Sequence, residues 1–167
     1  MNTSISFAIS SDLQADKATV LGHATAMRGV NRELGPLLRM TAPRAYREMT
    51  LFDAPVGQPL FRSFILLAWF IPIDFDHLSF ESIDRDSGFV ESSTMLSMTS
   101  WRHERRVTTR DDGGSRLVDR IAFTPRLPGT GGLLARLTAA IFRHRHARLR
   151  AMFGDQGEAP AVVNAFA

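Results

Sequence analysis

Apolar and polar residues alternate along much of the chain, with the period of two that is typical of strands with one buried face. At the N-terminus Ile5, Phe7 and Ile9 alternate with serine and alanine. The segments HLSFESI and FVESSTML alternate in the same way, and the sequence DRDSG between them supplies turn-forming residues. We therefore expect an N-terminal strand and, after Pro59, a run of antiparallel strands.

Other segments predict helices. Polar residues that favour a helix start precede apolar residues at helical spacing, so we expect a first helix from Asp16 to His23. A second short helix is expected from Gly29 to Leu34. Near the C-terminus a long helix is predicted by an apolar stripe with arginines opposite, which consists of Leu134, Leu137, Ile141, Leu149 and Phe153.

This order of elements predicts an α+β fold rather than a sandwich. An antiparallel sheet and a single amphipathic helix bury their apolar faces together only if the sheet curves around the helix. Because the helix covers only part of such a sheet, we expect a cavity between them. The length of 167 residues suits one domain, which we place at residues 1–153. Residues 154–167 lack periodicity and are expected to form a flexible tail.

The longest apolar run extends from Phe64 to Ile73, about half of what an apolar helix needs to span a bilayer. The surrounding sequence LFRSFILLAWF is apolar on both faces, which favours a buried central strand. The N-terminus has no basic region followed by an apolar run, and the chain has no cysteine. We therefore expect a cytoplasmic protein without a membrane span.

The segment from Trp101 to Pro125 is the most informative part of the sequence, and it predicts a β-hairpin with the sequence DDGG at its tip. On the return strand Leu117, Ile121 and Phe123 share one face, so Asp119, which lies between them in the alternation, is expected to point inward as well. The outgoing strand has two possible inner faces. Arg102, Glu104 and Arg106 make the better solvent face, which assigns the residues between them to the inner face: Trp101, His103, Arg105 and Val107.

The turn decides how these two inner faces meet. A two-residue loop of Asp112 and Gly113 would set Arg106 opposite Asp119 and so pair an outer face with an inner one. A three-residue loop with a glycine bulge, from Asp112 to Gly114, sets Val107 opposite Asp119. We favour the second loop, because it brings Trp101, His103, Arg105 and Asp119 together on the concave face.

The charge is divided unevenly along the chain. Residues 1–99 carry 8 basic and 11 acidic residues, whereas residues 100–167 carry 12 and 6. A mild excess of arginine usually forms a solvated face, so nucleic acid is not the expected partner. His144 and His146 are two residues apart on a helix and point in different directions, unlike the i and i+4 histidines of helical metal sites. No phosphate-binding loop or nucleophile motif occurs, and we expect neither a metal nor a cofactor.

The hairpin resembles the Bet v 1-like, START-related superfamily, also described as SRPBCC or polyketide cyclase/dehydrase. Many members carry a Trp-x-His-x-His/Arg-x-apolar strand, a Gly-Gly-Thr turn, and a Leu-x-Asp-x-apolar-x-aromatic-x-Pro strand before a C-terminal helix. The matching segments are WRHERRV from Trp101, GGS from Gly113, and LVDRIAFTP from Leu117. Ser115 replaces the common threonine, and the N-terminal signature of the family is nearly absent. The resemblance covers about residues 60–153.

The resemblance implies a helix-grip fold, in which a seven-stranded antiparallel sheet surrounds a long C-terminal helix and a hydrophobic cavity lies between them. This fold carries many functions, so it does not by itself imply an activity. The leading hypothesis is a monomer or homodimer that binds a hydrophobic small molecule, such as a lipid, a polyketide or an aromatic acid. The predicted ligand contacts are Trp69, Phe80, Met95, Trp101, His103, Arg105 and Asp119.

Two other hypotheses stay open at this point. A cyclase or dehydratase would use His103 as general base, Asp119 to orient it and Arg105 to stabilise an oxyanion. An interaction protein would bind anionic partners through the arginine face of the C-terminal helix, with strongly salt-dependent association. His103, Arg105 and Asp119 could also be a buried polar group that stabilises the hairpin and contacts no ligand.

Overall fold

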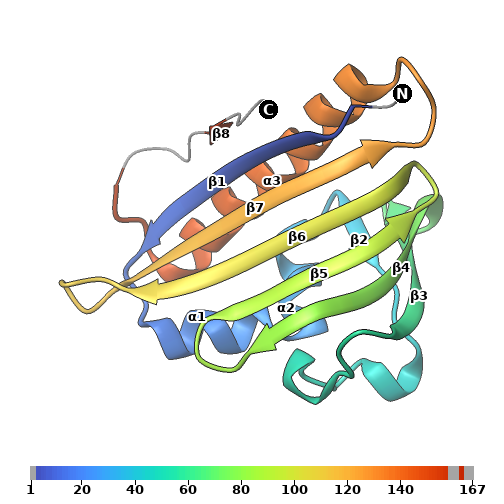
Figure 1. Cartoon of the computed structure of the whole chain (residues 1–167). Coiled ribbons are helices and arrows are strands. Elements are labelled where there is room, and N and C mark those ends of the chain that lie inside the picture. Colours follow the sequence, from blue (N-terminus) through green and yellow to red (C-terminus); the bar gives the residue numbers. More distant parts are fainter. Residues whose placement is uncertain (1–2, 158–161, 164–167) are drawn as a thin grey trace.

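The computed structural model describes residues 3–157 and 162–163. A curved antiparallel sheet surrounds one long helix, and two short helices close one end of the resulting half-barrel (Figure 1). The elements in chain order are β1 (Ile5–Leu13), α1 (Lys17–Ala24), α2 (Met27–Leu34), β2 (Leu38–Met40), the 3-10 turns η1 (Arg44–Tyr46) and η2 (Leu51–Asp53), β3 (Pro59–Leu67), β4 (Ile71–Asp84), β5 (Gly88–Met95), β6 (Met98–Thr109), β7 (Ser115–Pro125), α3 (Gly131–Phe153) and β8 (Val162–Val163).

The strand order in the sheet is β2-β3-β4-β5-β6-β7-β1-β8. The first and last long strands therefore meet, because β1 pairs with β7 along its whole length. Strands β1 to β7 form the predicted seven-stranded sheet, and the two residues of β8 extend it at the free edge of β1. With α3 packed against β1 and β7, this arrangement confirms the α+β helix-grip fold.

The short helices form where the sequence predicts them. The carboxylate of Asp16 caps α1 and accepts a hydrogen bond from the backbone N–H of Thr19 at 2.9 Å. Helix α2 begins at Met27, two residues earlier than predicted, and ends at Leu34 as predicted. None of the helices in the described ranges is long and apolar enough to cross a bilayer.

The inner face of α3 differs from the predicted stripe. Leu149 is fully buried as expected, but Leu137 is half exposed. The buried face contains Phe142, Arg145 and His146, which follow one another at helical spacing with Leu149. Polar residues occupy this face because the sheet presents charged side chains to the helix at the same level.

The hairpin of β6 and β7 has the predicted faces but a different register. The backbone N–H of Arg110 donates to the carbonyl oxygen of Gly114 at 2.9 Å, so the three-residue loop begins at Asp111 and ends at Gly113. Gly113 takes the positive φ of +85° that this type of loop needs. The loop therefore starts one residue earlier than predicted, which shifts the register by two and sets Arg105, not Val107, opposite Asp119. A shift of two leaves every side chain on its predicted face.

The prediction of a buried central strand from Phe64 to Ile73 is wrong. This segment ends β3, turns at Ala68 and Trp69, and begins β4 near the β2 edge of the sheet. Phe70 at the turn is 75% exposed and Trp69 is 58% exposed. Because α3 packs against β1 and β7, this end of the sheet has little to cover it. An apolar sequence therefore did not ensure burial here.

The predicted flexible tail lies partly outside the described residues, since residues 158–161 and 164–167 are not among them. Of those that are described, Asp155 pairs with Arg150, and the backbone N–H of Gln156 donates to the carbonyl oxygen of Asp12 at 3.1 Å. The backbone of Val162 and Val163 pairs with β1. The flexibility of the tail stays a prediction.

Candidate functional site

A cavity of about 330 Å³ lies between the concave face of the sheet and α3. Its walls are mostly apolar: Met95, Met98 and Trp101 line it from the sheet, and Leu134, Ile141 and Phe142 from the helix. The side chains of Ile73 and Leu137 also line the cavity and are about half exposed, so they lie at its border with solvent. The sheet and the helix therefore enclose an apolar space of the kind expected from the curvature of the fold.

Four ionisable side chains form a polar end to this cavity. Asp76 comes from β4, Glu91 from β5, His103 from β6 and Arg145 from α3, and all four are buried. Their strands are neighbours, and Glu91 is directly opposite His103 in the ladder. Because side chains on one face of a sheet alternate, the antiparallel pairing brings these inward-facing residues together.

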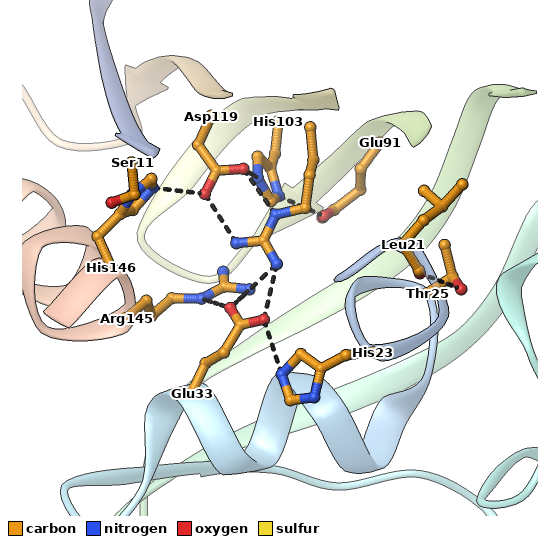
Figure 2. Close-up of polar contacts among 11 residues, drawn as sticks. Ser11, Leu21, His23, Thr25, Glu33, Glu91, His103, Asp119, Arg145 and His146 are labelled. Carbon is orange, nitrogen blue, oxygen red and sulfur yellow. Dashed lines mark hydrogen bonds and ion pairs between the residues drawn. The ribbon is translucent and has the colours of Figure 1, made fainter. Parts of the chain in front are cut away.

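Behind this polar end lies a buried ionic network, in which Figure 2 shows the carboxylates of Glu33 and Asp119. Arg105 is fully buried and lies between these two carboxylates. Its Nε and Nη2 each donate to an oxygen of Asp119 at 2.7 Å, in the bidentate geometry that suits a guanidinium and a carboxylate. Its Nη1 donates to both oxygens of Glu33, at 2.8 and 3.0 Å. One arginine therefore joins a strand of the hairpin to helix α2.

Glu33 holds a second arginine. Arg145 of α3 donates from Nε to Glu33 Oε2 at 2.9 Å, and His23 Nε2 lies 3.3 Å from Glu33 Oε1. Figure 2 shows Arg145 and His23 on either side of this carboxylate. The network thus connects the sheet with α1, α2 and α3, the elements that close the half-barrel.

Asp119 accepts two further hydrogen bonds. His103 Nε2 lies 2.8 Å from Asp119 Oδ1, and His146 Nε2 lies 3.0 Å from Oδ2. Since an ionised carboxylate only accepts, both histidines donate from Nε2, and His146 Nδ1 forms a hydrogen bond with the hydroxyl of Ser11 at 2.8 Å. With four donors around it, Asp119 has its hydrogen-bonding capacity filled.

The charges of this network are fixed by their mutual neighbours. Burial alone would raise the pKa of Asp119, but the positive charge of Arg105 outweighs it and holds that pKa well below its usual range. The pKa of Glu33 is lowered in the same way, against burial, by Arg105 and Arg145. Burial alone would lower the pKa of Arg105, but the two carboxylates outweigh burial and raise this pKa above its usual value. Both arginines and both carboxylates are therefore ionised together.

The pKa of Asp76 shifts in the opposite direction. Burial raises its pKa well above the usual range, and the nearby charge of Glu91 raises it further, although Ser93 acts against this. No arginine neutralises it, in contrast to Asp119. The neutral acid is accordingly the favoured form of Asp76, and the polar end of the cavity holds a carboxylic acid beside Glu91.

This arrangement limits what each group can do chemically. Each of the three guanidinium nitrogens of Arg105 already donates to a carboxylate, and the side chain is fully buried, so it has no contact with the cavity. It cannot stabilise an oxyanion there. His103 does line the cavity, and its Nδ1 lies 3.6 Å from Glu91 Oε2, beyond hydrogen-bonding distance. His103 and Arg145 are thus the members of the network that a ligand could contact.

The structure separates the seven predicted contact residues into four groups. Met95, Trp101 and His103 line the cavity together. Phe80 lines a smaller adjoining hollow of about 70 Å³, which also contacts His103 and Glu91. Arg105 and Asp119 are buried behind them, and Trp69 lies elsewhere, at the β3–β4 turn, where its Nε1 donates to the carbonyl oxygen of Pro36 at 2.9 Å.

Several residues of the site were missed from the sequence. Asp76 has the parity of Leu78 and Phe80, and Glu91 has the parity of Phe89, so the period of two already indicated two inward-facing acids. No comparable local signal marked the pairing of Glu33 with the two arginines, which lie 72 and 112 positions further along the chain. The expected separation of the two histidines on α3 is confirmed, because His144 bonds the carbonyl oxygen of Gly35. Within the described residues no cluster could hold a metal ion.

Comparisons with known proteins support the fold. The sequence matches the family described as a domain of unknown function (DUF8410) over residues 11–153. No curated protein matches it. Among solved structures, it is similar to protein CV1439 from Chromobacterium violaceum, with 10% identity, coverage of 91% of this chain and 99% of the other, and a TM-score of 0.68.

Two further solved structures share the expected fold. A START superfamily protein from Mycobacterium smegmatis is 8% identical over 89% of this chain and 97% of its own, with a TM-score of 0.58. Ara h 8.0201 is 12% identical over 89% and 99%, with a TM-score of 0.54. The Bet v 1-like, START-related fold is thus confirmed. At this level of identity, the similarity shows the fold alone.

Proposed function

We propose that this chain, which belongs to the DUF8410 family, binds a hydrophobic small molecule in the cavity between the sheet and α3. The description of the family gives no activity. The observation that carries the proposal is the cavity itself, about 330 Å³ of apolar-walled space with a few polar groups at one end. Ligand sites usually have this composition and volumes from roughly 300 Å³ upward.

The ionic network supports binding by holding the polar end in place. Asp119 fixes the ring of His103, and Glu33 fixes the guanidinium of Arg145, so the cavity side chains keep one geometry without a ligand. A preorganised site binds more tightly because less side-chain motion is lost when the ligand arrives. Through this network Arg105 and Asp119 would hold the cavity side chains in place without contacting the ligand.

A neutral environment-sensitive dye such as Nile red tests the proposal, together with native mass spectrometry to detect a co-purifying compound. Leu134→Trp should fill the cavity, because Leu134 lines it, and we expect dye affinity to fall at least tenfold. Leu133→Trp is the matched control, since Leu133 is the preceding residue of α3 and is exposed. Equal affinities of both variants, with both folded by circular dichroism, would contradict a site in this cavity.

A further inference from the structure

One carboxyl oxygen of Asp76 is a buried polar atom that the fold leaves without a partner. Its side chain is 2% exposed, it lines the cavity, and its Oδ1 has no hydrogen-bond partner. Among the described residues one other buried side-chain atom shares this condition, His23 Nε2, and that atom faces Glu33 at 3.3 Å. Buried polar atoms in native proteins are nearly always satisfied, so an exception in a cavity wall points to a partner that binds there.

Glu91 forms the second half of this position. Its Oε1 accepts from the hydroxyl of Ser93 at 3.0 Å, while Oε2 lies 3.6 Å from the nearest histidine nitrogen. Neither carboxyl group has an arginine of its own. Two buried carboxyl groups this close do not ionise together, because like charges in a poorly solvated site repel, so the pair keeps one proton.

The two arginines nearby already pair with carboxylates. Arg105 and Arg145 face Glu33 and Asp119, two cations against two anions, and the pairing distances are 2.7 to 2.9 Å. Among the described residues that line the cavity, Arg145 is the one lysine or arginine, and its charge already faces Glu33. A ligand carboxylate would therefore add a negative charge beside Glu91 without compensation, which disfavours acids as ligands.

We propose that the Asp76 and Glu91 pair selects, within the ligand class proposed above, apolar molecules that carry a hydroxyl group. This inference rests on the proposed function and narrows it. A hydroxyl both donates and accepts, so it satisfies Asp76 Oδ1 whichever carboxyl oxygen holds the proton. The apolar body of the ligand then lies against Trp101 of the sheet and Leu134 of α3.

The test compares ligands that differ only in their end group: 1-decanol, decanoic acid, decylamine and decane, each competing against Nile red at neutral pH. We expect 1-decanol to bind about tenfold more tightly than decane, the effect of one satisfied buried hydrogen bond, and decanoic acid to bind no better than decane. Equal binding of decanol and decane overturns the inference. So does tighter binding of the acid or of the amine.

Variants of the acid pair locate the effect. Asp76→Leu should abolish the preference for decanol while decane still binds, whereas Asp76→Asn should keep most of it, because an amide also donates and accepts. Glu81→Gln is the matched control, since Glu81 lies on the exposed face of the same strand and pairs with Arg102. A decanol preference that survives Asp76→Leu would refute the assignment.

Two outcomes separate this inference from the function on which it rests. If decane and Nile red bind but the end group has no effect, the cavity binds apolar molecules and the role of Asp76 is wrong. If neither Nile red nor any of the four compounds binds, the proposed function itself fails. Should Asp76→Leu not fold, the ligand series on the unaltered protein and on Asp76→Asn still decides between these outcomes.

Discussion

Two regions of the sheet have similarly apolar sequences and opposite degrees of burial. In the closed region, made of β1, β6, β7, α1 and the C-terminal half of α3, Leu13, Leu117 and Leu149 are fully buried in one cluster. In the open region, made of β2, β3 and the first half of β4, Phe64 and Phe70 are exposed. The difference is that α1 and α3 cover the closed region and leave the open region uncovered. Coverage by a helix, not apolar sequence, decided where the core formed.

The cavity lies between these regions, and its polar end borders the closed one. His103 is held by Asp119 of the closed region and Arg145 by Glu33 of α2, whereas Asp76 and Glu91 belong to strands of the sheet beyond the closed region. On this side of the site the charged groups are therefore already paired. The side toward the open region has the carboxyl pair that no arginine neutralises.

The largest expected effect comes from breaking the ionic network. Arg105→Ala leaves two buried carboxylates without their shared cation, and we expect the free energy of unfolding to fall by about 3–5 kcal/mol in urea titrations. Arg116→Ala is the control, because Arg116 makes a bidentate pair with Asp12 on the surface, and exposed pairs contribute about 0–1 kcal/mol. Similar losses in both variants would show that burial of the network does not matter.

Leucine truncations compare the two regions directly. Leu117→Ala in β7 removes a fully buried side chain and should lower the free energy of unfolding by about 2–5 kcal/mol. Leu67→Ala in β3 removes one that is 41% exposed and should lower it by less than about 1 kcal/mol. If Leu67→Ala destabilises the protein as strongly as Leu117→Ala, the open region is covered in solution.

The two kinds of buried acid should respond to pH in opposite directions. Glu33 and Asp119 have lowered pKa values, so their contribution to stability is present above pH of about 4, the usual carboxyl pKa, and is lost as the pH falls through the folded values. Asp76 has a raised pKa, so its contribution is present below that pH and is lost as the pH rises.

Asp76→Asn isolates the second response. Because asparagine does not ionise, this variant should gain stability relative to the unaltered protein as the pH rises from about 4 to 7, by about 1.4 kcal/mol for each unit by which the folded pKa of Asp76 exceeds its usual value. Urea titrations across this range measure the difference. A difference that does not change with pH would mean that Asp76 is not protonated in the folded protein.

The smallest effect is expected at the exposed turn of the open region. Phe70→Ser should change the free energy of unfolding by no more than about 0.5 kcal/mol, because the side chain is 75% exposed. Analytical ultracentrifugation of the same variant shows whether the turn takes part in self-association. A loss of stability that grows with protein concentration would indicate a homodimer interface here rather than a free surface.

The candidate site shows what the alternation of apolar and polar residues can predict and what it cannot. Alternation alone placed Trp101, His103, Arg105 and Asp119 on the inner face, and that assignment held although the turn was placed one residue late. The same alternation runs through Asp76 and Glu91, but these two inward-facing acids were missed from the sequence. It did not reveal that Arg105 would be enclosed by Glu33, because a helix on a different part of the chain supplies that carboxylate.

The sequence by itself determined the elements, their order and the inner face of the hairpin, because these depend on local periodicity and turn chemistry. Only the tertiary structure decided which apolar strands were covered, since that depends on where α3 lies across the sheet. It also decided the state of each acid. Asp119 and Asp76 are both buried aspartates on inward-facing strand positions, yet one lies against Arg105 and the other against Glu91. A neighbour of opposite or like charge keeps one ionised and favours the neutral form of the other.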